Sequence, residues 1–381
     1  MNPLTFSARR ITGGAVLLGL LGLLGAALAA LALVDVSPGH SVPPQAGSPS
    51  GPGGLSPAGT AGLAASSPAG LRLLREAAAA GVTTSYQGVQ IVAWWGPHGA
   101  STSIVQVWHE RDRSILAQVT DMGSVQSTAA PEAAAGEQDP DGILGLSQQL
   151  LGLMRRNYQV VYAGRGSAVN RQAQIVDLRR PGGSLAARYW LDTATKLPLR
   201  RETFDSRARM ISEDAFINLR IGGSGLRGMP VPDVRPWSAR LDPAQIARLR
   251  AHGWPVPRLL PGNLMLVAAH QTAAAAGPVI DLDYSDGLSL VSIFLQRGQL
   301  PGALPGWEEA RFRGGAVYST DPDWRSLAWS AHGFVYTVIA EAPAATIDQV
   351  VDALPHDSGP GFWGRIGRGI RRLGSWANPF R

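Results

Sequence analysis

The chain contains no cysteine among its 381 residues and only one lysine, Lys196. The absence of cysteine excludes disulfides, thiolate-ligated zinc, iron–sulfur clusters, thiol nucleophiles and a diacylglycerol anchor on an N-terminal cysteine. Whatever stability the fold has must therefore come from packing and hydrogen bonding.

Sequence patterns for catalysis are also lacking. The chain has no GxSxG, HExxH or SxxK motif, and none of its seven histidines has another four residues away. Two histidines at that spacing would lie on one helical face, as metal ligands often do. We therefore expect no catalytic residue, no metal site and no cofactor.

The net charge of +6 is concentrated at the two ends of the chain. Two arginines lie near the N-terminus, and five lie in a tail that has no acidic residue after Asp357. Without these seven the chain has 27 basic against 28 acidic residues. The charge therefore gives no support for nucleic-acid binding.

An uncharged segment of 24 residues, Ile11 to Val34, follows Arg9 and Arg10 and precedes Asp35. At about 1.5 Å per residue, a helix of this length would span a hydrocarbon core of about 30 Å. The flanking charges place the N-terminus in the cytosol and the rest of the chain outside. Two interpretations stay open: a retained single-pass anchor, or a signal peptide cleaved at a small-residue site.

Composition divides the remaining chain into further segments. Residues 1–36 form the anchor or signal segment, and the Pro-, Gly- and Ser-rich residues 37–70 form a flexible tether. We predict an N-terminal domain over 71–222, a linker over 223–240, a C-terminal domain over 241–357 and a basic tail over 358–381.

The N-terminal domain alternates apolar and polar residues over many short runs, which is typical of antiparallel strands. Helices are expected at Leu71–Ala80 and from Ile143 to near Arg156, and 120–140 is expected to be a loop. The predicted fold class is α+β, with a large, strongly curved antiparallel sheet. The predicted strands are Tyr86–Trp95, Thr102–His109, Ser114–Val119, Tyr158–Ala163, Gln172–Leu178, Ala187–Asp192, Pro198–Phe204 and Ile211–Leu219.

The C-terminal domain is predicted to be a smaller antiparallel α+β unit. Asp242-Pro243 forms an N-cap and first-turn pair for a helix to about Ala251, and Ala344–Leu354 is a second helix. Asp286-Gly287 between two apolar runs is a strong hairpin signal. The predicted strands are Leu264–His270, Val279–Tyr284, Leu288–Leu295, Ala316–Ser319, Ser326–Ser330 and Phe334–Ala340.

Three tryptophans fall on neighbouring predicted strands together with valine and isoleucine. Because apolar residues occupy both faces of these strands, helices and loops could simply cover the sheet. Alternatively, its concave face could line a cleft for an acyl chain or an apolar partner segment. The candidate cleft residues are Val89, Ile91, Trp94, Trp95, Val105, Val107 and Trp108.

The tail has the pattern of a basic amphipathic helix. Its apolar residues fall on about one third of a helical wheel, opposite the arginines, which suits a membrane surface. Four glycines oppose helix formation, so a solvated tail is the alternative. The candidate membrane-surface residues are Trp363, Arg365, Arg368, Arg371, Arg372 and Trp376.

Several short segments, in this order and spacing, resemble the MucB/RseB family of sigma-factor regulatory proteins, in its actinobacterial type. The resemblance covers roughly Leu71 to Leu354. Its segments are Tyr86–Gly88, Ala163–Arg165, Ile175–Leu178, Tyr189–Asp192, Thr195–Leu199, Tyr284–Leu288, Val291–Phe294, Gly315–Tyr318 and Glu341–Thr346.

This resemblance implies an N-terminal half-barrel with covering helices, similar to the lipoprotein carriers LolA and LolB, and a smaller second domain. It implies a non-enzymatic, exported regulator of an envelope-stress pathway. Such a regulator would bind the extracytoplasmic part of a membrane-anchored anti-sigma factor and release it when a lipid or lipoprotein occupies the cleft. The candidate partner-binding residues are Tyr284, Asp286, Gly287, Leu288 and Phe294.

Two other functions remain as alternatives at this stage. A lipid or lipoprotein carrier of the cell envelope would use the same fold, because a fold does not fix a function. A secreted hydrolase is the third hypothesis.

Overall fold

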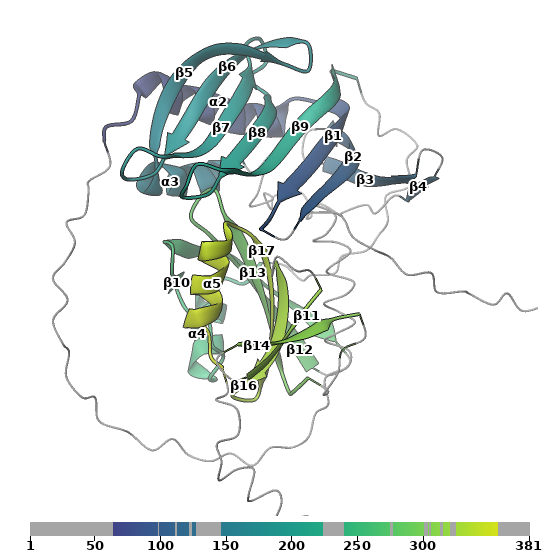
Figure 1. The fold of residues 1–381 in the computed structure, drawn as a ribbon, viewed down its shortest axis with the longest axis vertical. Coiled ribbons are helices and arrows are strands. Elements are labelled where there is room, and N and C mark those ends of the chain that lie inside the picture. The colour runs from purple at the N-terminus through teal and green to yellow at the C-terminus, as the bar shows by residue number, and fades with distance from the viewer. Residues whose placement is uncertain are drawn as a thin grey trace, which may run out of the picture.

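The computed structural model describes residues 64–97, 99–110, 113–121, 124–126, 146–223, 240–274, 277–300, 304, 306–312, 315–320 and 325–356. They form two antiparallel sheets, one above the other in Figure 1. We call residues 64–223 the N-terminal unit and residues 240–356 the C-terminal unit.

The N-terminal unit has one nine-stranded sheet in the order β4-β3-β2-β1-β9-β8-β7-β6-β5. Its two ends meet in the middle of the sheet, where β1 pairs with β9 and the Gly222 amide donates to the Ser85 carbonyl at 2.8 Å. The strands are β1 (Tyr86–Trp95), β2 (Ala100–Glu110), β3 (Arg113–Asp121), β4 (Ser124–Gln126), β5 (Gln159–Ala168), β6 (Arg171–Arg179), β7 (Leu185–Asp192), β8 (Pro198–Phe204) and β9 (Met210–Ile221).

Two helices, α2 (Pro68–Thr83) and α3 (Gln148–Asn157), pack on one face of this curved sheet (Figure 1). The predicted α+β class with a large curved antiparallel sheet is therefore confirmed. Helix α2 begins before the predicted Leu71 because Ser67 accepts a hydrogen bond from the Gly70 amide and Pro68 suits the first turn.

Helix α3 begins at Gln148, later than the predicted Ile143. Ser147 has an extended backbone and caps the helix, with its hydroxyl accepting from the Leu150 amide at 3.2 Å. Leu150, Leu153 and Met154 then face the sheet and are buried. Strand β4 lies inside the segment 120–140 that we expected to be a loop.

The C-terminal unit has an eight-stranded sheet in the order β10-β11-β12-β13-β17-β16-β15-β14. Two strands of this sheet, β10 and β14, were not predicted from the sequence. The strands are β10 (Leu259–Leu260), β11 (Leu264–Ala274), β12 (Gly277–Ser285), β13 (Leu290–Arg297), β14 (Glu308–Phe312), β15 (Gly315–Ser319), β16 (Ser326–Ala331) and β17 (Phe334–Glu341).

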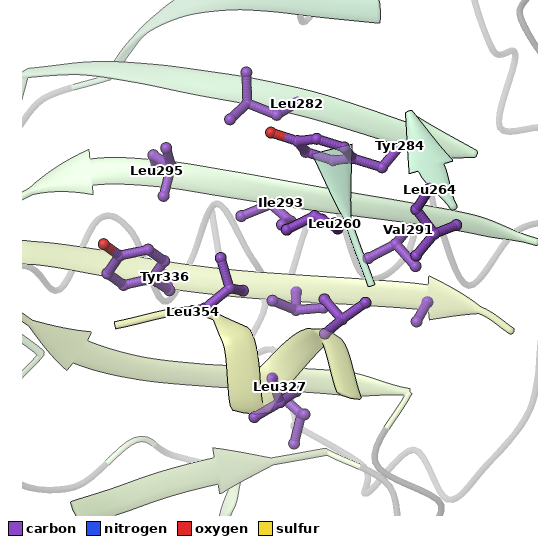
Figure 2. Packing of buried hydrophobic residues seen from close by; sticks show 14 of the residues in the cluster. Leu260, Leu264, Leu282, Tyr284, Val291, Ile293, Leu295, Leu327, Tyr336 and Leu354 are labelled. Carbon is purple, nitrogen blue, oxygen red and sulfur yellow. The ribbon is translucent and has the colours of Figure 1, made fainter. Parts of the chain in front are cut away.

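Helices α4 (Pro243–Ala251) and α5 (Ala344–Ala353) lie on one side of this sheet (Figure 1). The predicted cap of α4 is present as a capping box, in which Asp242 and Gln245 each accept from the other's amide. Figure 2 shows the core beside α5, where Tyr284, Ile293 and Leu327 from β12, β13 and β16 point toward the helix. Alternation along each strand places these apolar residues on the helix side.

Candidate functional site

The helix-facing side of the N-terminal sheet changes from apolar to polar at its centre. In one register row Tyr189 on β7 is followed by Arg201 on β8 and Asp214 on β9. In the neighbouring row Thr203 and Ser212 lie between Ala187 and Trp94. Helices α2 and α3 cover the β5–β7 part of this face, where the apolar residues belong to one buried cluster.

The turn between β12 and β13 of the C-terminal unit lies against α3. The Asn157 side-chain amide donates to the Asp286 carbonyl at 2.8 Å, and a Cβ added to Gly287 would lie 2.5 Å from the Met154 amide nitrogen. Gly287 has a φ of +104°, which glycine adopts at low cost. Glycine is thus required here both by the turn and by the close approach to the other unit.

Asp286 holds this turn and connects it to the N-terminal unit. One carboxylate oxygen accepts from the amides of Leu288 and Ser289 at 2.9 and 2.7 Å. The other accepts from the Tyr158 hydroxyl at 2.6 Å. Burial raises the pKa of Asp286, although these hydrogen bonds oppose the rise. Burial and the neighbouring carboxylate also raise the pKa of Tyr158 well above 10.0, so its hydroxyl stays protonated and donates.

We call this contact between the turn at 286–288 and the N-terminal unit the junction. Apolar and polar contacts extend it on both sides of the turn. Val267 of β11 is buried within the apolar cluster of α2 and α3, and Leu288 packs against the same cluster. The Gln149 side-chain amide donates to the Val267 carbonyl at 2.7 Å, and Arg201 donates to the Leu288 carbonyl at 3.0 Å. The two units therefore share one apolar cluster as well as hydrogen bonds.

Four charged side chains meet beside the turn: Arg201 and Asp214 from the N-terminal unit, and Arg325 and Glu341 from the C-terminal unit. Arg201 approaches Asp214 with a distance of 3.9 Å between nitrogen and oxygen. Burial raises the pKa of Asp214, although Arg201 lowers it. Burial raises the pKa of Glu341, at the end of β17, to about 7; Asp214 adds to the rise, and Arg201 and Arg325 oppose it.

Trp94 closes the junction at the end of β1. Its side chain is buried, and the guanidinium of Arg325 lies 5.0 Å from the centre of its ring, which is a cation–π geometry. Trp94 therefore contacts the C-terminal unit through the guanidinium of Arg325.

These residues line a small cavity between the units. Its volume is about 20 Å³, and Trp94, Tyr158, Arg201, Asp214 and Glu341 are among its walls. A cavity of this size holds about one water molecule. In this arrangement of the units the cavity does not have room for an acyl chain.

The seven candidate cleft residues lie on two faces of the β1–β2 pair. Trp94, Val105 and Val107 are buried on the helix-facing side, in a cluster with Tyr86 and Phe216. Strand alternation turns the other four outward: Val89, Ile91 and Trp108 are half-buried, and Trp95 is exposed. The structure therefore brings three of the seven together on the face that a cleft would use.

The five candidate partner-binding residues are used within the molecule. Tyr284 is buried in the core of the C-terminal unit, and its hydroxyl donates to the Pro257 carbonyl at 2.8 Å. Asp286, Gly287 and Leu288 form the junction described above. Phe294 is buried and pairs with Asp281 and Thr337, so alternation places it on the sheet face opposite Ile293.

The candidate membrane-surface residues Trp363, Arg365, Arg368, Arg371, Arg372 and Trp376 lie outside the described residues, and so does Ile11 to Val34. Among the helices that the structure describes, none combines the length and apolar character needed to cross a bilayer. Within the same residues, no three His, Asp or Glu side chains are grouped to hold a metal ion.

The charged and polar junction residues were missed by the sequence reasoning. Tyr158, Arg201, Asp214, Arg325 and Glu341 come from five separate elements or element ends, and no motif links them. One pattern in the sequence could have indicated the junction. Polar residues occupy the helix-facing positions of β8 and β9, whereas the neighbouring strands are apolar there, so this part of the face is not covered by an apolar helix.

Residues 111–244 match the family model described as the MucB/RseB N-terminal domain. No curated protein matches the sequence. Among solved structures, the MucA/MucB complex of Pseudomonas aeruginosa is 19% identical, with 74% of this chain and 96% of that chain covered and a TM-score of 0.42. A structure of MucB alone is 18% identical, with 76% and 99% covered and a TM-score of 0.47. A LolA superfamily protein from Nitrosomonas europaea is 11% identical, with 42% and 94% covered and a TM-score of 0.20.

Proposed function

We propose that this chain, a MucB/RseB-type protein by its residues 111–244, is an exported regulator that binds the extracytoplasmic region of a membrane-anchored anti-sigma factor. The family match carries the proposal, because it covers β3 to β9 and so most of the N-terminal sheet. The chain would act by binding, as a regulator of an envelope-stress sigma factor, and not as an enzyme.

Binding of the anti-sigma factor would shield it from proteolysis, and a lipid or lipoprotein would release it. The cavity of about 20 Å³ supports a specific form of this idea. Trp94 lines this cavity, so a lipid would reach it there only if the two units moved apart. Lipid and partner would then bind different arrangements of the units, and each would weaken binding of the other.

The candidate partner surface on the C-terminal unit has a similar constraint. Asp286, Gly287 and Leu288 contact the N-terminal unit, and a partner would have to replace those contacts or bind elsewhere on the unit. We propose that the partner is bound by both units together, so that their relative position sets its affinity.

Calorimetry with the detergent-solubilised full chain and the extracytoplasmic region of a single-span anti-sigma factor from the same genome would test this. We expect a one-to-one complex that is lost on adding envelope lipid. The same region of an unrelated single-span protein is the matched control. If lipid co-purifies stoichiometrically and no anti-sigma factor binds, a lipid or lipoprotein carrier is the better description.

The proposed location is the cell membrane, with the body of the protein outside and the N-terminal segment either retained or cleaved. N-terminal sequencing of the mature protein separates these two forms. A start at Met1 shows a retained anchor, whereas a new start near Leu31 or Leu33 shows cleavage.

A further inference from the structure

The partly buried charges at the junction suggest a property that does not depend on the identity of the partner. Glu341 is the last residue of β17, and its side chain lies where the C-terminal unit meets the polar centre of the N-terminal sheet. One of its carboxylate oxygens is buried and has no hydrogen-bond partner. An ionised carboxylate in that position loses the hydration of one oxygen without replacement, which is costly.

We propose that the contact between the two units is a proton-sensitive latch, closed when Glu341 is protonated and loosened when Glu341 carries its charge. Opening the junction would return the carboxylate to water and remove the cost of burying it. Closing the junction would favour the neutral acid.

The groups around Glu341 explain why the arginines do not cancel this cost. Arg201 also approaches Asp214 and donates to the Leu288 carbonyl, so its charge is shared. Arg325 lies over the ring of Trp94. Asp214 faces Glu341 as a like charge, and Glu213 on β9 adds to the negative field at Asp214. Arg180, the remaining charged residue lining the cavity, donates to the carbonyls of Leu185, Phe204 and Asp205.

The direction of the pH effect follows from the pKa shift. In the closed junction the pKa of Glu341 is raised from 4.5 to about 7, first by burial and then by Asp214. The closed form therefore binds the proton more tightly than an open form with a normal carboxyl group. Its advantage is complete below pH 4.5 and is lost as the pH rises to about 7. The raised pKa values of Asp214 and Asp286 act in the same direction.

Fluorescence energy transfer within the full chain would test the latch. The chain has no cysteine, so Ala194→Cys and Ala251→Cys introduce two thiols for dyes at exposed positions, one in each unit. From the raised pKa of Glu341 alone, the ratio of separated to closed molecules should rise about 30-fold between about pH 5.5 and about pH 8. Identical distributions at the two pH values would overturn the proposal.

Two substitutions link the effect to Glu341. Glu341→Gln keeps the size of the side chain and imitates the protonated acid, so the ratio of separated to closed molecules should change far less between the two pH values than in the parent. Glu308→Gln makes the same change at an exposed position of β14 and should behave like the parent. If Glu341→Gln responds to pH as the parent does, Glu341 is not the group that senses it.

A third variant covers the case in which Glu341→Gln folds poorly. Asp214→Asn removes the like charge beside Glu341 and should move the midpoint of the transition to lower pH. A midpoint that does not move, or that moves upward, contradicts the proposed cluster. Far-ultraviolet circular dichroism of each variant establishes that both sheets are folded before the comparison is made.

Discussion

The Tyr158 hydroxyl donates to the Asp286 carboxylate over 2.6 Å, and this bond joins the end of α3 to a turn 128 residues later in the chain. Both side chains are buried. The same carboxylate closes the turn between β12 and β13. The bond therefore couples the shape of a local turn to the contact between the two units.

Replacing Tyr158 by phenylalanine should weaken that contact. The substitution leaves a buried carboxylate oxygen without its donor, and a hydrogen bond to a charged group is worth about 1.5–3 kcal/mol. Urea unfolding at pH 7 should show a lower midpoint. Tyr162→Phe, on β5 beside the same apolar cluster, is the control and should change the midpoint little. Equal midpoints for Tyr158→Phe and the parent would show that the bond contributes nothing.

Gly287→Ala should weaken the contact between the units and should destabilise the protein more than the same substitution at a glycine away from that contact. Its added Cβ meets the backbone of α3 at 2.5 Å, and the left-handed φ adds strain. Gly277→Ala is a matched control, because Gly277 has a φ of +113° but open space around its Cβ. Both variants should lose about 1 kcal/mol through φ, and Gly287→Ala should lose about 1–3 kcal/mol more. Equal losses in thermal unfolding would exclude a close approach at Gly287.

Asp192→Asn should destabilise the N-terminal unit in a pH-dependent way. Burial alone would raise the pKa of Asp192, but hydrogen bonds from Arg171 and Thr195 outweigh it and lower the pKa. The ionised form thus stabilises the fold above the usual value of 3.8, and this contribution is lost as the pH falls through the lowered value. The stability gap between parent and variant should be widest near neutral pH and shrink in acid. A gap that is constant with pH would contradict this.

Deleting residues 361–381 should reduce membrane association without affecting folding. The arginines and tryptophans of the predicted amphipathic tail suit an anionic lipid surface. Sedimentation with vesicles that contain anionic lipid, using a form that starts at Asp35, isolates the tail from the N-terminal segment. Changing the four arginines of the predicted helix to glutamine is the companion variant. Unchanged sedimentation of both forms would assign the tail no role at the membrane.

Capping and turn residues in the sequence predicted several element boundaries. Asp242-Pro243 marked the start of α4, and Asp286-Gly287 marked the turn between β12 and β13. The strands that alternate clearly were found within a few residues of their ends. Strands β10 and β14 were missed because β10 has only two residues and β14 is an edge strand with a mostly polar pattern.

The site was harder to predict than the fold. The list of candidate cleft residues included both Trp94 and Trp95, although alternation places these adjacent residues on opposite faces of β1 and only Trp94 is buried. The junction depends on register between strands and on contact between units, as with Asp214 and Glu341, which are far apart in sequence. No pattern in a single sequence encodes such a pairing. The family resemblance, in contrast, was confirmed over residues 111–244, which match the MucB/RseB N-terminal domain model and contain four of the nine segments that carry the resemblance.

The pairing of β1 with β9 decides how the molecule would respond to mechanical load. Ser85 and Gly222 lie side by side at one end of this antiparallel pair; α2 precedes Ser85, and the chain continues from Gly222 toward the C-terminal unit. Once α2 has been pulled off the sheet, a load applied at Ser85 and Gly222 would open the pair from that end, one hydrogen bond after another. The strands would unzip under a small force and would not have to be sheared apart all at once.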